Sequence, residues 1–166
     1  MHSTAQKWLA AMLHKAMEDN KVQQVFLASN ARQEQHFWHM RESISPAQKA
    51  AGLSIKHDIS LPFAALSSFV AQAEKEIKAT VPEGQIICFG HIGDGNLHYD
   101  ILLPKFYSKA EFFKLFEQVN KQVYAIVAAL GGSFSAEHGI GRWKIKEMQH
   151  FKDKTCLLYT SPSPRD

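Results

Sequence analysis

Apolar residues recur at intervals of three and four along much of the chain, which is the spacing of one helix face. A clear example is residues 109–130, where the apolar stripe continues until Gly131 and Gly132, a pair typical of a helix end. The same spacing predicts further helices over 3–18, from Asn30 to near Pro46, over 63–79, and from about 142 to 151.

Strict alternation of apolar and polar residues predicts a half-buried strand over 53–61 and another over 97–103. Residues 86–89 form an unbroken apolar run, which is typical of a central strand. Shorter apolar segments at 22–27 and 133–136 are predicted as strands as well. The resulting order, α-β-α-β-α-β-β-α-β-α, favours an α+β layer sandwich in which helices pack on one face of an antiparallel sheet.

The composition is that of an ordinary globular domain, with 45% of the 166 residues hydrophobic and 21% charged. This content excludes disorder over the whole length. Two cysteines, Cys88 and Cys156, are too few for a disulfide scaffold or a four-cysteine zinc site. The net charge of +3 is too small for a nucleic-acid-binding surface, and no apolar run is long enough for a transmembrane segment.

The two ends of the chain differ in character. The N-terminus lacks the charged-then-apolar order of a signal peptide, so we expect a cytoplasmic or mitochondrial protein and not a secreted one. Residues 155–166 are rich in Ser and Pro, and we expect them to form a disordered or non-native tail. The main domain is therefore predicted over residues 1–154.

Two of the nine histidines flank a glycine-rich segment with the sequence HIGDGNLH, residues 91–98. If the flanking strands form a hairpin, His91 and His98 stand side by side on one sheet face, where neutral imidazoles suit a metal such as Zn²⁺. Glu137, at the end of a predicted strand, is the best candidate for a third ligand, and this set leaves coordination positions open. The alternative is that both histidines are ordinary polar residues of a hairpin. His138 is a candidate general base or a helix-start residue bonded to nearby backbone.

A second group of polar residues lies upstream. Arg41 and Ser45 are four residues apart and share one face if their helix continues. Lys56 lies on the polar face of its predicted strand. A guanidinium, a hydroxyl and an ammonium that converge would bind a carboxylate. The alternative is that all three are solvated surface groups.

Four segments carry a resemblance to a known family: FWHMRESI (37–44), SIKHDISLP (54–62), FGHIGDGNLH (89–98) and SAEHGIG (135–141). In this order they closely resemble the C-terminal domain of the FAD-linked oxidases that act on D-2-hydroxy acids. That group includes D-lactate dehydrogenase, the glycolate oxidase subunit and D-2-hydroxyglutarate dehydrogenase. The resemblance covers roughly residues 5–150.

The resemblance implies a ferredoxin-like α+β cap domain, with helices on one face of an antiparallel sheet, that closes over FAD. It implies that the FAD is held mainly by an N-terminal domain missing from this sequence. It implies that His91, His98 and Glu137 bind a divalent metal such as Zn²⁺. His138 would contact the substrate hydroxyl and act as the catalytic base.

The resemblance also assigns the upstream group. Arg41, Ser45 and Lys56 match positions that hold the substrate carboxylates, although members that act on hydroxyglutarate often have Thr where Ser45 stands. Asp100 is a larger departure, because those members commonly have Asn there in contact with substrate. An Asp at this position would repel a carboxylate or bind metal itself, which puts a second substrate carboxylate in doubt.

We therefore expect residues 1–154 to be the N-terminally truncated cap and substrate domain of a flavin-dependent dehydrogenase. The intact enzyme would oxidise a small D-2-hydroxy acid to a 2-oxo acid and pass its electrons to an acceptor that the sequence does not identify. The fragment alone is expected to be inactive. Two alternatives stay open: a stand-alone metallohydrolase that uses the same His-His-Glu set, and a non-catalytic module for metal binding or subunit interaction.

Overall fold

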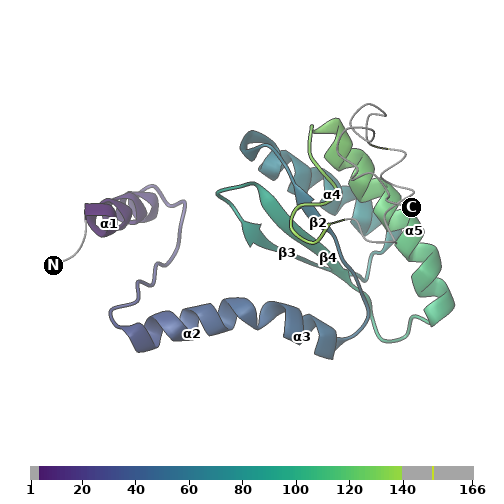
Figure 1. The fold of residues 1–166 in the computed structure, drawn as a ribbon, viewed down its shortest axis with the longest axis horizontal. Coiled ribbons are helices and arrows are strands. Elements are labelled where there is room, and N and C mark those ends of the chain that lie inside the picture. The colour runs from purple at the N-terminus through teal and green to yellow at the C-terminus, as the bar shows by residue number, and fades with distance from the viewer. Residues whose placement is uncertain (1–3, 140–150, 152–166) are drawn as a thin grey trace, which may run out of the picture. The chain divides into compact units, whose positions relative to one another are not determined.

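A computed structural model describes residues 4–139 and residue 151 of the chain (Figure 1). The chain divides into two compact units, Met1–Ser45 and Pro46–Asp166. The first unit contains helices and no strand among its described residues. The second unit contains an antiparallel sheet and the two helices that pack on it. All three candidate metal ligands, His91, His98 and Glu137, belong to this unit.

The first unit contains helices α1 (Thr4–Glu18) and α2 (Ala31–Glu42), and both were predicted from helical spacing. Asn30 caps α2, because its side chain accepts a hydrogen bond from the backbone N–H of Gln33, a donor that the helix itself leaves unpaired. The strand predicted over 22–27 is wrong. Strands need a partner for their backbone groups, and no described segment pairs with these residues.

The helix predicted from Asn30 toward Pro46 is interrupted at Ser43, whose hydroxyl donates to the backbone carbonyl of His39 at 2.7 Å. A separate helix, α3 (Ile44–Ala51), begins at the next residue. Pro46 therefore lies in the first turn of α3 and not at the end of the preceding helix. This position suits proline, because the N–H that it lacks would have no partner within the helix.

The central strand of the antiparallel sheet is β4 (Asn96–Leu102). One side of it pairs with β3 (Gln85–His91), as the predicted hairpin requires. The other side pairs with β1 (Ser54–Ile55) and then β2 (Asp58–Ser60). The strand predicted over 53–61 is thus present as two short strands separated by two residues.

The expectation that residues 86–89 form a central strand is wrong. Within the described part of the chain, β3 pairs with β4 alone, and its side chains are exposed or half-buried. An apolar run of strand length does not by itself distinguish the middle of a sheet from its edge. The fully buried Tyr99 and Ile101 show that β4 is the interior strand.

Two amphipathic helices cover one face of the sheet: α5 (Lys109–Ala129), and α4 (Leu66–Thr80) with the short 3-10 helix η1 (Phe63–Ala65) before it (Figure 1). The ring of Phe69 meets the ring of Tyr99 edge-on, with centroids 5.2 Å apart. The core combines the apolar stripes of both helices with alternate strand residues: Ile55, Ile59, Tyr99, Ile101, Phe69, Ala73, Ile77, Val119, Val123 and Val127. The predicted α+β class is confirmed.

The segment after α5 forms an isolated antiparallel bridge between Ser133 and Ser60, and not the strand predicted over 133–136. The bridge brings this segment alongside β2. The helix predicted to end at Phe151 and the tail predicted over 155–166 lie outside the described residues, Phe151 itself excepted. No helix in the described part is both long and apolar enough to cross a membrane.

Gly95, in the turn between β3 and β4, gives the first testable prediction. Its φ is +70°, and a Cβ there would overlap the carbonyl oxygen of Leu61. We expect Gly95→Ala to lower the free energy of unfolding by about 2–3 kcal/mol, because the backbone conformation and this close approach must both change. Urea unfolding followed by circular dichroism measures the loss.

Gly93→Ala is the matched control in the same turn. A Cβ at Gly93 would meet no atom within 4 Å, so we expect a change of no more than about 0.5 kcal/mol. Equal losses in the two variants would show that the turn does not depend on the approach of Gly95 to Leu61.

Candidate functional site

The register of the sheet gathers polar side chains on the face that the helices do not cover. Asp58 stands opposite His98 across β2 and β4, and His91 stands opposite Asn96 across β3 and β4. Residues directly opposite in an antiparallel pair, and residues two apart along a strand, point to the same side. Asp58, His91 and His98 therefore share one face, while Tyr99 points into the core on the other.

Glu137 approaches these histidines from the segment that follows α5. Its Oε1 lies 2.8 Å from Nδ1 of His91, and its Oε2 lies 4.0 Å from Nε2 of His98. Glu137 thus lies near both histidines that were predicted as metal ligands. Two imidazoles and a carboxylate supply nitrogen and oxygen donors that suit Zn²⁺. Whether they bind an ion stays a prediction.

The carboxylate of Asp58 holds the segment that carries Glu137 against the sheet. Its Oδ2 accepts hydrogen bonds from the backbone N–H groups of Glu137 at 2.9 Å and His138 at 2.8 Å. Its Oδ1 accepts one from the side-chain amide of Asn96 at 3.0 Å. Only 6% of Asp58 is exposed, so these three donors replace most of the water that an ionised carboxylate would otherwise bind.

The same contacts decide the charge of Asp58. Burial by itself raises the pKa of this carboxyl group, but the hydrogen bonds from the His138 backbone, the Asn96 side chain and the Glu137 backbone outweigh it, and the pKa is lowered. Asp58 is therefore ionised at neutral pH. The sequence did not single it out, because its two backbone donors come from residues 79 and 80 positions away.

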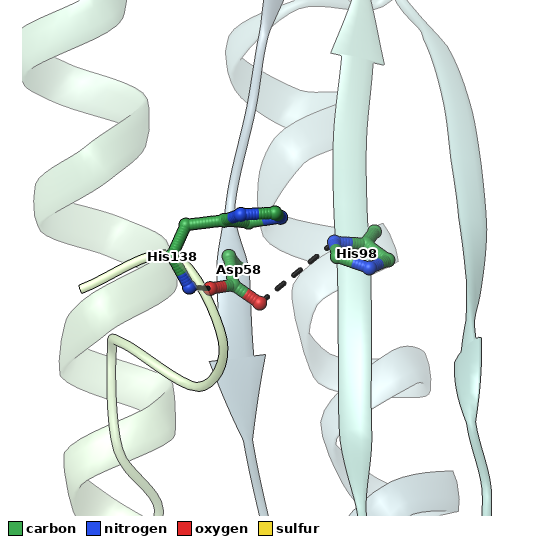
Figure 2. Close-up of side chains that lie close together, drawn as sticks. All are labelled: Asp58, His98 and His138. Atoms are coloured by element: carbon green, nitrogen blue, oxygen red, sulfur yellow. Dashed lines mark hydrogen bonds and ion pairs between the residues drawn. The ribbon is translucent and has the colours of Figure 1, made fainter. Parts of the chain in front are cut away.

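The ring of His98 lies beside Asp58 and His138, as Figure 2 shows. Its centroid is 4.9 Å from that of Phe89 and 5.7 Å from that of His138. Its Nδ1 lies 3.8 Å from Oδ1 of Asp58. Among the described residues, the set whose donor atoms all lie within 4.8 Å of one another is Asp58, His98 and His138, and not the predicted set of His91, His98 and Glu137. His98 thus belongs to two candidate ligand sets.

Asp100 lies two residues beyond His98 on the same face of β4, and only 3% of it is exposed. Its Oδ1 accepts a hydrogen bond from the backbone N–H of His57 at 3.2 Å. Burial raises the pKa of Asp100, although the His57 hydrogen bond and the positive charge of Lys56 act in the opposite direction. Lys56 itself donates from Nζ to Oε1 of Gln48 at 3.1 Å. A cation and a buried carboxyl group therefore act on each other at this position.

The other two residues predicted to hold substrate belong to the first unit. Arg41 lies in the last turn of α2, and Ser45 is the second residue of α3. The shared helix face expected for them required one continuous helix, and the interruption at Ser43 removes that condition. Their convergence with Lys56 on a carboxylate stays a prediction.

Comparison with known proteins supports the resemblance found in the sequence. The chain is 36% identical over 150 residues to a probable D-2-hydroxyglutarate dehydrogenase, mitochondrial, of Oryza sativa subsp. japonica. It is 34% identical over 155 residues to a D-2-hydroxyglutarate dehydrogenase of Stutzerimonas stutzeri. These alignments cover 90% and 93% of the chain but 25% and 33% of the two relatives, so the chain spans about a quarter to a third of their length.

The family comparison extends over almost the whole sequence. Residues 2–159 match the C-terminal domain of FAD linked oxidases. This range includes both histidine-containing segments, the upstream Arg41 and Lys56, and every described helix and strand. The chain therefore belongs to the family of FAD linked oxidases, C-terminal domain.

Proposed function

We propose that the chain is the substrate- and metal-binding cap domain of a flavin-dependent dehydrogenase that oxidises a D-2-hydroxy acid to a 2-oxo acid. The observation that carries this proposal is the cluster of His91, His98 and Glu137 on the open face of the sheet, in a chain of this family. Because the chain spans only part of its relatives, we propose that FAD is held mainly by another domain of the intact protein.

The donors of the cluster fit a divalent metal, and Zn²⁺ is the ion that we propose. His91 and His98 come from adjacent strands of one hairpin, and Glu137 lies 2.8 Å from His91 and 4.0 Å from His98, so these three side chains are the proposed protein ligands. When bound, such an ion acts as a Lewis acid toward the hydroxyl and carboxylate of a 2-hydroxy acid.

The remaining residues would bind and deprotonate the substrate. His138 takes the hydroxyl proton while the Cα–H bond breaks and the carbon–oxygen bond becomes double. FAD would accept the hydride, because it supplies the electron chemistry that no side chain can. Lys56 and Arg41, with the hydroxyl of Ser45, hold the substrate carboxylate through charge-assisted hydrogen bonds. An acceptor outside this chain then removes the electrons.

Asp100 bears on which hydroxy acid fits. D-2-hydroxyglutarate carries a second carboxylate, and an Asp on the site face repels a negative group at short range. The names of the relatives favour this dicarboxylate, whereas Asp100 favours a substrate with one carboxylate. Comparing the turnover of D-lactate and D-2-hydroxyglutarate by the intact protein decides between them.

The names of the relatives also suggest a compartment. Those from Oryza sativa and Arabidopsis thaliana include the word mitochondrial, whereas the name of the Stutzerimonas stutzeri relative does not. For this chain we propose mitochondria in a eukaryotic cell or the cytoplasm in a bacterial one. Fractionation of cells that produce the intact protein tests this location directly.

The proposed role predicts that the 166-residue chain alone does not oxidise 2-hydroxy acids. Hydride removal needs an acceptor, and we place the acceptor on another domain. The purified chain is mixed with Zn²⁺ or Mn²⁺ and assayed on D-lactate, glycolate and D-2-hydroxyglutarate with an artificial electron acceptor. We expect no turnover, and turnover only when the FAD-binding domain is joined. Turnover without any flavin would instead favour an independent metalloenzyme.

The carboxylate-binding role of Lys56 predicts the effect of Lys56→Met in the intact protein. Loss of a charge-assisted hydrogen bond of about 2–3 kcal/mol should lower kcat/KM by roughly 30- to 150-fold. Lys49→Met is the control, because Lys49 is exposed on α3 and its substitution removes the same charge from the protein. If steady-state kinetics of both variants match the wild type, Lys56 does not bind the substrate carboxylate and is an ordinary solvated residue.

A further inference from the structure

Asp58 has no part in the reaction proposed above, yet its carboxylate accepts hydrogen bonds from Asn96, Glu137 and His138. We propose that Asp58 is a positioning residue that aims Nε2 of His98 at the metal and fixes Glu137 beside it, without binding the metal itself. This inference rests on the proposed metal site. It takes His91, His98 and Glu137 as the ligands, although the described donor atoms that converge within 4.8 Å are those of Asp58, His98 and His138, and we expect Glu137 and His91 to close on the ion when it binds.

The oxygens of Asp58 are already committed to protein donors. Oδ2 accepts two backbone N–H groups, from Glu137 at 2.9 Å and His138 at 2.8 Å, and Oδ1 accepts the amide of Asn96 at 3.0 Å. A carboxylate has about four acceptor positions, and these three bonds use all but one of them, on Oδ1. A metal on Oδ1 would compete with the amide of Asn96 for the same oxygen, so we expect Asp58 to keep its hydrogen bonds and not to bind the ion.

The ring of His98 lies beside Asp58. Its Nδ1 lies 3.8 Å from Oδ1 of Asp58, and its Nε2 lies on the side of Glu137, 4.0 Å from Oε2. A neutral imidazole has one N–H, and a carboxylate lies near each of its two nitrogens. Asp58 is slightly closer than Glu137, and its side chain is 8% exposed against 39%, so water screens it less and we expect the proton on Nδ1. The lone pair is then on Nε2. Metal-binding histidines commonly have a carboxylate near the ring nitrogen that does not bind the metal.

The ring of His98 has little freedom to turn away from this orientation. Phe89 lies on one neighbouring strand, with ring centroids 4.9 Å apart, and His138 has its centroid 5.7 Å away. Figure 2 shows the imidazole of His98 on β4 with Asp58 and His138 beside it. Only 15% of the His98 side chain is exposed. Packing restricts the plane of the ring, and the less exposed Asp58 favours the proton on Nδ1.

Asp58 also connects the parts of the chain that carry the other two ligands. Its bond to the backbone of Glu137 holds that ligand at the sheet, although Glu137 lies 79 residues away in the sequence. Its bond to Asn96 reaches the residue that stands opposite His91 in the hairpin. One carboxylate thus bears on all three proposed ligands, and its removal should weaken metal binding even though it binds no metal.

The test uses the 166-residue chain, its Asp58→Asn variant and an Asp94→Asn control. Asp94 is exposed in the same hairpin, and its Oδ1 accepts the backbone N–H of Asn96, a bond that Asn can keep. The control therefore removes an equal charge close to the site. Zn²⁺ and Mn²⁺ affinities are measured by isothermal titration calorimetry, and circular dichroism checks that each variant is folded. We expect about 10- to 100-fold weaker binding for Asp58→Asn and no change for Asp94→Asn.

A second measurement needs neither a metal nor a variant. Long-range ¹H–¹⁵N spectra of the metal-free wild-type chain report which nitrogen of His98 carries the proton, and we expect Nδ1. A proton on Nε2 would overturn the proposal, as would unchanged metal affinity in a folded Asp58→Asn variant or an equal loss in Asp94→Asn. If the wild-type chain binds neither ion, the proposed metal site fails, and the His98 tautomer alone decides whether Asp58 orients the ring.

Discussion

The carboxylate of Asp58 is the contact on which the candidate site depends, because it joins three separate parts of the chain. It belongs to β2, it accepts the side-chain amide of Asn96 from β4, and it accepts the backbone N–H groups of Glu137 and His138. The isolated bridge between Ser60 and Ser133 brings the segment after α5 alongside β2, and the hydrogen bonds of Asp58 fix the orientation of that segment. The site is therefore assembled by a buried anion and its hydrogen bonds.

One face of the sheet packs in the core, and the other carries the candidate site. Alternate residues of β4 point to the two faces: Tyr99 and Ile101 are fully buried against the helices, while His98 and Asp100 face the site. Because a shift of one residue would exchange the two faces, the register must be well defined. The close approach of Gly95 to Leu61 fixes the turn at the end of the hairpin, and so helps to keep His98 on the site face.

Local patterns in the sequence were enough for α1, α4, α5 and the β3–β4 hairpin, and the hairpin placed His91 and His98 on one face of the sheet. Each of these depends on spacing along the chain or on the shared face of two adjacent strands. Glu137 was proposed from its place at the end of a predicted strand, and the structure has only an isolated bridge there. Asp58 was not predicted, because an Asp at a polar position of an alternating strand resembles any solvent-facing residue. Its donors are remote in sequence, and only the folded chain shows them.

Two further differences between the predicted strands and the observed ones have the same physical origin. The apolar run of β3 predicted a central strand, but the pairing of strands depends on which segments the chain brings together, and β4 has the interior position. The segment 22–27 has the composition of a strand and no described partner. Hydrophobicity thus indicated how a segment tends to fold, whereas position in the sheet followed from contacts between distant residues.

The central claim is that a metal bound by this chain contacts His91, His98 and Glu137 while Asp58 keeps its hydrogen bonds. Anomalous diffraction from crystals of the chain grown with Zn²⁺ locates the ion directly. The account predicts one anomalous peak bonded to the imidazole of His91, to Nε2 of His98 and to the carboxylate of Glu137, at about 2.0–2.2 Å from each. A peak bonded to Asp58 and His138 would contradict it.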